Sequence, residues 1–496
     1  MNQTTSRKIS FFAALSICFT SIVGIGIFLK NASVGKNVEG NGISWLMTWI
    51  ISGILAILLA YHFGRISRIE SKKGLTGLSA WTNEIADKKN NWFKKIVSVN
   101  YGFFYNPILT LCLSFFCTEF LIDFFKIAID KNIHVDIWIY VLISLSLNIF
   151  FILNNYFSVK FSGHISIVTS IIKFIPLLMV IFIGLIFANS HNLDSNTTNG
   201  FKENISFSKA IQGIMLSIPS VFFAFDSFVG VGAWSKDIKG GEKTVPKVII
   251  TAMILVTIIY CLVCLSSIFH FNPNKDGEGT TILNVLIDSL PINVKKGITI
   301  FISLTIFISA FGTSNSICGT SMNEFKNLIL HKKTIFSNLL SIKFGIKKAS
   351  LFLALILTGF WSLIIFIPSI IINSDAIIDG FSNIVVIFAF MIYSYLIFLF
   401  WRKEKKEFKN KTLNSIMVWI TIVGVSVIVF LNVFYVFLNG IEDWDKSSTW
   451  GLLLTGKNYS SIQNLDVLIF YITFSFVFFS FPFINYWIVQ KQRKVI

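Results

Sequence analysis

The sequence predicts an all-α polytopic membrane protein with twelve transmembrane helices. The chain of 496 residues is 54% hydrophobic and only 14% charged, with a mean hydropathy of +0.73. Soluble domains carry about 25% charged residues. Twelve long apolar runs follow one another along the chain, and glycines interrupt two of them near their middles. Together these three observations favour one membrane-embedded unit over several soluble domains.

The twelve runs are each long enough to cross a bilayer, which takes about 18 or more apolar residues. The first lacks a small-residue cleavage site and continues into the series, so we expect a retained span and no signal peptide. One transporter domain is therefore predicted over residues 1–490, followed by a short tail, 491–496. The runs lie near 10–29, 44–64, 97–125, 136–153, 161–187, 209–233, 247–269, 297–322, 349–372, 376–400, 413–437 and 465–490.

The lysines and arginines that give the formal net charge of +17 lie mostly on one side of the predicted membrane spans. With the N-terminus taken as cytoplasmic, the inside segments hold 30 Lys and Arg residues, the outside loops hold 10, and Lys173 and Lys209 lie in spans. The positive-inside rule then places both termini in the cytoplasm of a multi-pass plasma-membrane protein. We expect the basic excess to contact anionic lipid headgroups, and no nucleic acid as a partner. The oligomeric state is left open.

Residues for enzymatic or cofactor chemistry are not grouped in this sequence. It contains no P-loop, its six histidines are scattered, and its six cysteines all fall within spans. Cys261-x-x-Cys264 has the spacing of a redox or metal pair, but thiols in an apolar helix are typically buried and inert. An acyl or glycosyl transferase would need His, Asp or Glu clustered at one interface. We therefore expect no enzyme activity, no cofactor and no metal.

The two interrupted spans are the first and the sixth. The first contains Ser-Ile-Val-Gly-Ile-Gly-Ile-Phe over 21–28, and the sixth contains Phe-Asp-Ser-Phe-Val-Gly-Val-Gly over 225–232. Broken helices at corresponding positions of two halves indicate a transporter binding site near the bilayer midplane. Their freed backbone groups are tolerated only where they are buried in protein, line a cavity or bind a ligand. A channel or a scaffold would not need two such breaks.

Lys173 lies near the centre of the fifth span, too deep to reach either membrane surface easily. Charged residues at such depth are costly and usually functional. One interpretation is a structural tether to backbone carbonyls. The other is a proton site, because a buried amine can release and regain a proton as its surroundings change.

Other polar groups within spans have two interpretations each. Asp226, at the sixth-span break, is either a cap for free N–H groups or a contact for a cationic group. The stretch 313–316, Thr-Ser-Asn-Ser, serves either helix packing or a cavity. Pro107, following Tyr105 and Asn106, predicts a kink in the third span. Glu119 is expected near the outer end of that span, facing water.

At these residues the chain resembles the amino acid–polyamine–organocation (APC) permeases. The segment 23–28 resembles their G-S-G-I-F signature in the first span. The segment 222–228, with Ser235–Lys239 and Thr244–Pro246, resembles their sixth-span pattern F-F-A-Y-x-G-F followed by A-E-E-V-K-N-P and T-I-P. Many members carry a lysine where this chain has Lys173, and 379–382 and 401–403 also fit. The resemblance covers most of the chain.

Several positions depart from the family pattern and leave the substrate open. Ile25 replaces the usual small polar residue between the two glycines, and Ser227 stands where glycine is common. Gly240-Gly241 replaces N-P, Met322 stands where arginine is frequent, and 71–77 matches the usual P-x-G-G only loosely.

The resemblance implies a five-plus-five inverted repeat with discontinuous helices 1 and 6, plus two extra helices. The repeats would span about 10–187 and 209–400, and the extra helices 413–490. N–H groups at the first break would bind the substrate carboxylate, and carbonyls at the sixth would bind its ammonium. The implied substrate-binding residues are Val23, Gly24, Ile25, Gly26, Asn106, Phe223, Phe225, Asp226, Ser227, Phe228 and Asn315. The implied proton-coupling residues are Lys173, Thr313 and Ser314.

The function that follows is secondary active import of amino acids across the plasma membrane, coupled to protons, by alternating access. The substrate side chain would lie against aromatic residues, which favours apolar or cationic side chains. The alternative is an exchanger of amino acids or polyamines that is not coupled to protons.

Overall fold

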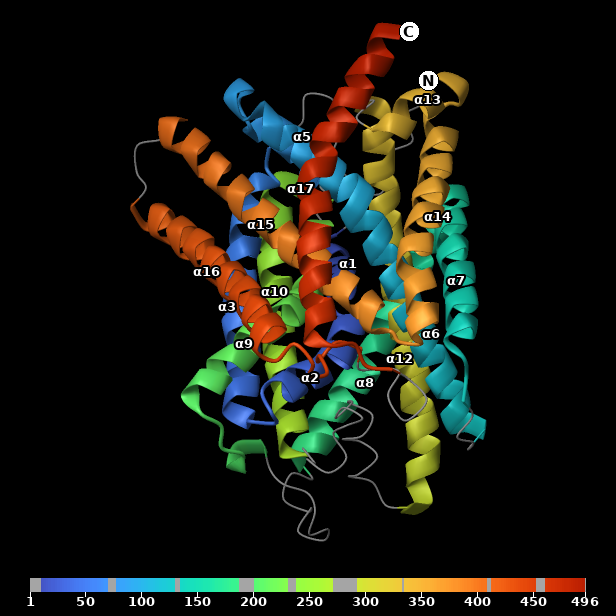
Figure 1. Cartoon of the computed structure of the whole chain (residues 1–496), viewed down its shortest axis with the longest axis vertical. Coiled ribbons are helices and arrows are strands. Elements are labelled where there is room, and N and C mark those ends of the chain that lie inside the picture. Colours follow the sequence, from blue (N-terminus) through green and yellow to red (C-terminus); the bar gives the residue numbers. More distant parts are fainter. Residues whose placement is uncertain are drawn as a thin grey trace.

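The computed structural model describes residues 10–69, 77–129, 134–186, 200–230, 238–270, 292–331, 334–407, 412–451 and 460–495. In these ranges the chain is built from helices joined by short turns (Figure 1). Their bounds are α1 Phe11–Ile22, α2 Ile25–Asn37, α3 Gly42–Ile66, α4 Leu78–Ile85, α5 Asn91–Val99, α6 Asn106–Ile129, α7 Ile137–Phe157, α8 Val159–Ile186, α9 Phe207–Phe225, α10 Gly241–Phe269, α12 Ile292–His331, α13 Ile335–Lys343, α14 Ile346–Ile372, α15 Ala376–Glu407, α16 Thr412–Glu442 and α17 Asn464–Val495.

The membrane spans agree with the twelve predicted from hydropathy. In the described part of the chain, 11 helical segments are long and apolar enough to cross a bilayer, and the bent pair α1 and α2 supplies a twelfth. The predicted end of the first span was wrong, however. It was placed at residue 29, whereas α2 continues to Asn37 and buries Lys30 and Asn31 inside the bundle.

The two interrupted spans lie inside the bundle. Helix α2 packs against α9, while α1 packs against α8, α10 and α12. Helix α3 lies along α10, and α12 lies along both α6 and α8. The last two long helices, α16 and α17, stand at the front of the view in Figure 1, and the C-terminal end of α17 lies at the same end of the molecule as α13. This packing surrounds the breaks with protein, as freed backbone groups require at membrane depth.

Prolines within spans leave carbonyls without a helical donor, and other helices supply one. Proline has no N–H, so the carbonyl four residues earlier loses its bond. For three prolines a side chain from a distant helix donates to that carbonyl instead. The donors are Trp361 Nε1 to Phe103 O (2.7 Å) for Pro107, Asn432 Nδ2 to Met215 O (3.0 Å) for Pro219, and Asn100 Nδ2 to Phe478 O (3.1 Å) for Pro482.

The third span bends through a π-helix. The predicted kink before Pro107 takes the form of six π-helical residues, Asn100–Tyr105, which join α5 to α6. Asn106 Nδ2 donates to the carbonyl of Tyr101 at 2.6 Å, which satisfies one acceptor of this irregular turn. π-helical turns of this kind are rare and occur often at functional sites.

Candidate functional site

The first break separates α1 from α2 by two residues. Helix α1 ends at Ile22, Val23 is extended, and α2 begins at Ile25, with a bend of 41° between the two axes. No side chain caps the N-terminus of α2. A Cβ on Gly26 would lie 2.7 Å from the Cβ of Ala224 and close to its Cα. Glycine at 26 therefore allows α2 to contact the backbone of α9 directly.

The second break follows α9. This helix ends at Phe225, and Asp226 is extended, with φ −69° and ψ 177°. Ser227 has φ +79°, in the left-handed region that glycine favours. In the permeases that this chain resembles, glycine is common at this position. The serine therefore keeps the backbone conformation that a glycine would adopt at the break.

Tyr260 of α10 joins the two breaks. Its hydroxyl lies 3.2 Å from the carbonyl of Ile22 at the end of α1 and 3.2 Å from the carbonyl of Ala224 near the end of α9. Its ring packs edge-on against Trp49 and tilted against Phe225. A single hydroxyl thus serves carbonyls that both helix ends leave exposed inside the bundle.

A small cavity lies between the breaks. Its volume is about 20 Å³, close to the space one water molecule needs, so the site is closed around too little room for an amino acid. We call it the central cavity. Its lining residues are Ser21, Ile22, Ile25, Gly26, Leu109, Leu113, Phe223, Asp226, Ser227, Thr313 and Ile317.

The structure brings part of the predicted site together at this cavity. Ile25, Gly26, Phe223, Asp226, Ser227 and Thr313 line it. Val23 and Gly24 lie directly beside it, within the first break. Phe225 instead packs against Trp49 and Tyr260, and Phe228 packs against Phe63 and Tyr393.

Three predicted polar residues, Asn106, Ser314 and Asn315, do not line the central cavity. Asn106 accepts a hydrogen bond from Ser321 Oγ, in addition to its bond to the carbonyl of Tyr101. Asn315 joins α12 to α7 and α8 through Asn154, Asn155 and Ser162. Ser314 donates to the carbonyls of Leu113 and Ala310. For Ser314 and Asn315 this geometry corresponds to the packing interpretation of the stretch 313–316.

Lys173 lies fully buried under the first break. Its Nζ donates to the carbonyl of Thr20 at 2.6 Å, the carbonyl of Val23 at 2.9 Å and Thr313 Oγ1 at 2.7 Å. Thr313 in turn donates to the carbonyl of Ser309, so its oxygen acts as an acceptor for the lysine. Three acceptors match the three hydrogens of an ammonium group. Lys173 thus joins α8 to α1 and α12 through three hydrogen bonds.

Asp226 is surrounded by donors. The hydroxyl of Tyr105 donates to one carboxylate oxygen, and the other accepts from the backbone N–H of Ser227 at 2.7 Å and the hydroxyl of Tyr393 at 3.4 Å. The side chain is 3% exposed. Among the described residues, these neutral donors and no cation contact the carboxylate, and the bond from Ser227 holds the turn at the second break.

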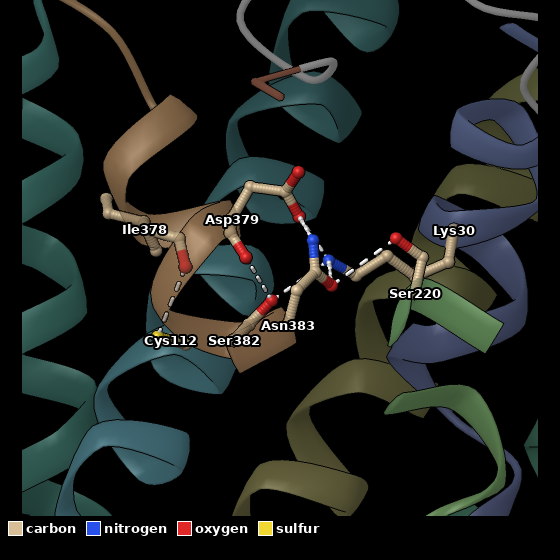
Figure 2. Close-up of polar contacts among 7 residues, drawn as sticks. All are labelled: Lys30, Cys112, Ser220, Ile378, Asp379, Ser382 and Asn383. Atoms are coloured by element: carbon tan, nitrogen blue, oxygen red, sulfur yellow. Dashed lines mark hydrogen bonds and ion pairs between the residues drawn. The ribbon is translucent and has the colours of Figure 1, made fainter. Parts of the chain in front are cut away.

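Lys30 was missed as a site residue because it follows the last apolar residue of the predicted first span. It is 1% exposed, and its Nζ donates to the carboxylate of Asp379, to Ser382 Oγ at 2.9 Å and to Asn383 Oδ1 at 3.0 Å (Figure 2). The ring centroid of Phe223 lies 4.8 Å from the same nitrogen. The sequence signal that was available is Asp379, an acidic residue at the start of an apolar span that needs a counter-charge.

A second, larger cavity opens beyond Lys30. It holds about 350 Å³ and is lined by residues that include Asn37, Gln212, Asn383, Asn439 and Trp450. We call it the distal cavity. Asn383 lines the distal cavity and Phe223 lines the central one. Because both contact Lys30, the lysine lies between the two cavities.

The comparisons with known proteins agree with this geometry. Residues 9–456 match the family model described as "Amino acid permease". The chain belongs to the amino acid permease family. Its architecture is also similar to that of MhsT in complex with L-phenylalanine, with a TM-score of 0.53 and 12% identity over 84% of this chain and 98% of MhsT. This permease therefore shares its fold with MhsT.

Curated relatives of this permease match at low identity. The human cystine/glutamate transporter is 22% identical over 62% of this chain and 58% of its own length. The serine/threonine exchanger SteT of Bacillus subtilis is 21% identical over 62% of this chain and 65% of its own. An uncharacterized protein of Mycoplasma pneumoniae is 22% identical over about half of each chain. The chain thus spans one half to two thirds of the length of the relatives that it matches.

Proposed function

We propose that this permease imports amino acids across the plasma membrane by alternating access, as a secondary active transporter coupled to protons. Both termini would lie in the cytoplasm. The transport unit would consist of two inverted repeats, near 10–187 and 209–400, and the extra helices 413–490 would pack outside it.

The observation that carries this proposal is the pair of helix ends at the central cavity. The first amide groups of a helix have no partner within it, and α2 has no side-chain cap at Gly24. Its N-terminus therefore offers N–H groups and a positive dipole end to a carboxylate. The last carbonyls of α9, which ends at Phe225 beside the same cavity, offer acceptors to an ammonium group. Every α-amino acid carries both groups.

The walls of the central cavity favour a neutral side chain. Leu109, Leu113, Phe223 and Ile317 are apolar, and the carboxylate of Asp226 already accepts from Tyr105 and from the backbone of Ser227. A cationic side chain would have to displace these donors. The names of the relatives include serine, threonine, cystine and glutamate carriers, which supports amino acids as the substrate class.

Lys173 provides the basis for proton coupling. In the closed arrangement its three hydrogens meet acceptors on α1 and α12, so the charged form fits. A movement of α1 away from α8 would remove the carbonyls of Thr20 and Val23, and a buried ammonium without acceptors is costly. The proton would then leave as the first span moves, which links it to the gate.

Exchange without protons is the second candidate, favoured by the relative named as a serine/threonine exchanger. In that case Lys173 would remain charged throughout and act as a tether between α8 and the first break.

A liposome experiment separates the two candidates. The purified chain would be reconstituted and assayed for uptake of radiolabelled L-serine and L-leucine, at pH 5.5 and 7.5 outside. Liposomes would be either empty or preloaded with unlabelled substrate. Proton coupling predicts acid-stimulated uptake into empty liposomes, which Lys173→Met removes. Lys348→Met, a change at an exposed lysine of α14, serves as the matched control.

Each outcome has a distinct meaning in this assay. Uptake only into preloaded liposomes, with no effect of pH, identifies an exchanger. Acid-stimulated uptake by Lys173→Met with an unchanged pH profile assigns Lys173 the tether role. Absence of saturable uptake and counterflow for all twenty amino acids and common polyamines would refute amino acid transport.

A further inference from the structure

Glu119 of α6 is a buried carboxyl group that the proposed mechanism does not use. The expectation that it faces water is wrong, because it is only 2% exposed. Neither of its oxygens has a hydrogen-bond partner among the described residues. An ionised carboxylate in such a place would lose its hydration and gain nothing in return, which costs several kcal/mol or more. This observation needs a chemical explanation.

The face of α6 that carries Glu119 contacts the Lys30 cluster. Cys112 Sγ donates to the carbonyl of Ile378, at the start of α15, as Figure 2 shows. The ring of Phe116, one turn further, lies 5.4 Å from Lys30 Nζ. Residues separated by three, four and seven positions share one face of a helix. Glu119 therefore follows Phe116 along the face that meets α2 and α15.

The charged groups around Glu119 do not neutralise the negative charge that it would carry when ionised. The groups that act on it electrostatically are Asp123 on its own helix, Asp375 and Asp379 at the start of α15, and Lys30 on α2. Lys30 already donates to Asp379, Ser382 and Asn383, and these acceptors use its three hydrogens. No hydrogen of the lysine is left for Glu119. Lys36 acts on Asp375 and Lys126 acts on Asp123, so three cations face four carboxyl groups, and an excess of negative charge remains if all are ionised.

We propose that Glu119 is a proton-binding site of the transport cycle, loaded when the path between the two cavities closes. The proposal rests on the proposed carrier function and adds a site distinct from Lys173. In the closed arrangement Lys30 is paired with Asp379, and Glu119 holds one proton as a neutral acid.

The position of the cluster connects this proton to substrate movement. A substrate that passes from the distal to the central cavity must pass Lys30, which contacts residues lining both. Opening releases Lys30 from Asp379 and admits water, so Glu119 gives its proton to the distal solvent and can pair with the lysine. Closing restores the Lys30–Asp379 pair and leaves Glu119 without a cation, so it takes one proton from the distal side. One proton is bound at each closure and one is released at each opening, both on the distal side, so the site makes closure depend on pH there and moves no proton across the membrane.

Infrared spectroscopy of the purified full chain tests the protonation state directly. A neutral carboxylic acid and a carboxylate absorb at different frequencies. We expect a carboxylic acid band at pH 7 that Glu119→Gln removes and Glu119→Asp keeps. The matched control is Asp123→Asn, one turn further along α6 at a partly exposed residue, which should leave the band in place. Identical spectra for the wild type and Glu119→Gln, with both proteins folded, would overturn the proposal.

Transport measurements test the coupling. Glu119→Gln fixes the neutral form, so counterflow of L-serine, measured with the same pH on both sides of the membrane, should lose its dependence on pH. Glu119→Asp should keep a pH-dependent counterflow. If Glu119→Gln retains the wild-type pH profile, the coupling role is refuted. If the infrared band belongs to Glu119 but the wild type transports no amino acid, the proton-binding site stands and the proposed carrier function fails.

Discussion

Replacement of Gly26 by alanine tests whether the close contact between α2 and α9 forms the substrate site. The added Cβ would lie 2.7 Å from the Cβ of Ala224, whereas carbon atoms pack at roughly 3.5–4.0 Å. The two helices would have to move apart by about 1 Å. Overpacking of this kind costs ~1–3 kcal/mol. At 1.4 kcal/mol per factor of ten, that is a loss of roughly 5- to 150-fold in the population of the closed site.

The assay combines L-serine uptake into liposomes with ligand-dependent thermal stability of the purified protein. Gly26→Ala should lower L-serine uptake and ligand binding by roughly 5- to 150-fold. Gly26→Val should abolish uptake and binding while the protein still inserts into the membrane. The matched control is Gly359→Ala in α14, where a Cβ has no neighbour within 4 Å. That change should leave transport intact and raise stability by ~0.4–1 kcal/mol. Wild-type uptake by a folded Gly26→Ala protein would refute the reasoning.

Three further changes test individual contacts of the breaks. Asp226→Asn should weaken the binding of L-leucine and L-lysine equally in thermal-shift titrations, because the carboxylate serves the second break; a loss confined to lysine would place Asp226 against a cationic side chain. Tyr260→Phe removes the donor shared by two carbonyls and should lower the free energy of unfolding by about 1–3 kcal/mol, measured by denaturant unfolding in detergent, and an unchanged value would contradict that role. Ser227→Gly should relieve a left-handed backbone and raise stability by ~1 kcal/mol, whereas Ser227→Val should lower both stability and uptake. Equal stabilities of the two Ser227 variants would show that the positive φ carries no strain.

The sequence located the parts of the site that depend on the backbone. The glycines at 24 and 26 indicated the first break, and the glycine-containing segment 225–232, with Asp226 at the break, indicated the second, because an apolar helix is interrupted only where its freed groups have a use. The depth of Lys173 was likewise evident from its position within an apolar run. These properties are local, since they depend on residue type and spacing along one helix.

Polar residues within spans were less predictable. Asn106 and Asn315 were expected at the substrate site, yet they bond to Ser321 and to Asn155 within the helix packing. Hydropathy says that a polar residue in a span must face protein, and it does not say which neighbour it faces. The rotation of each helix about its own axis decides that, and neighbouring helices fix the rotation.

By itself, the sequence determined the twelve spans, the two breaks and the family resemblance, because lipid imposes length, apolarity and internal hydrogen bonding on every crossing. Only the tertiary structure decided the partners across helices. Lys30 meets Asp379 across 349 positions of the chain, and Trp361 donates to the carbonyl that Pro107 leaves free. The burial of Glu119, with no hydrogen-bond partner in the described ranges of the chain, also emerges only there. Such pairings arise when helices far apart in sequence pack together, and no periodicity along the chain encodes which donor meets which acceptor.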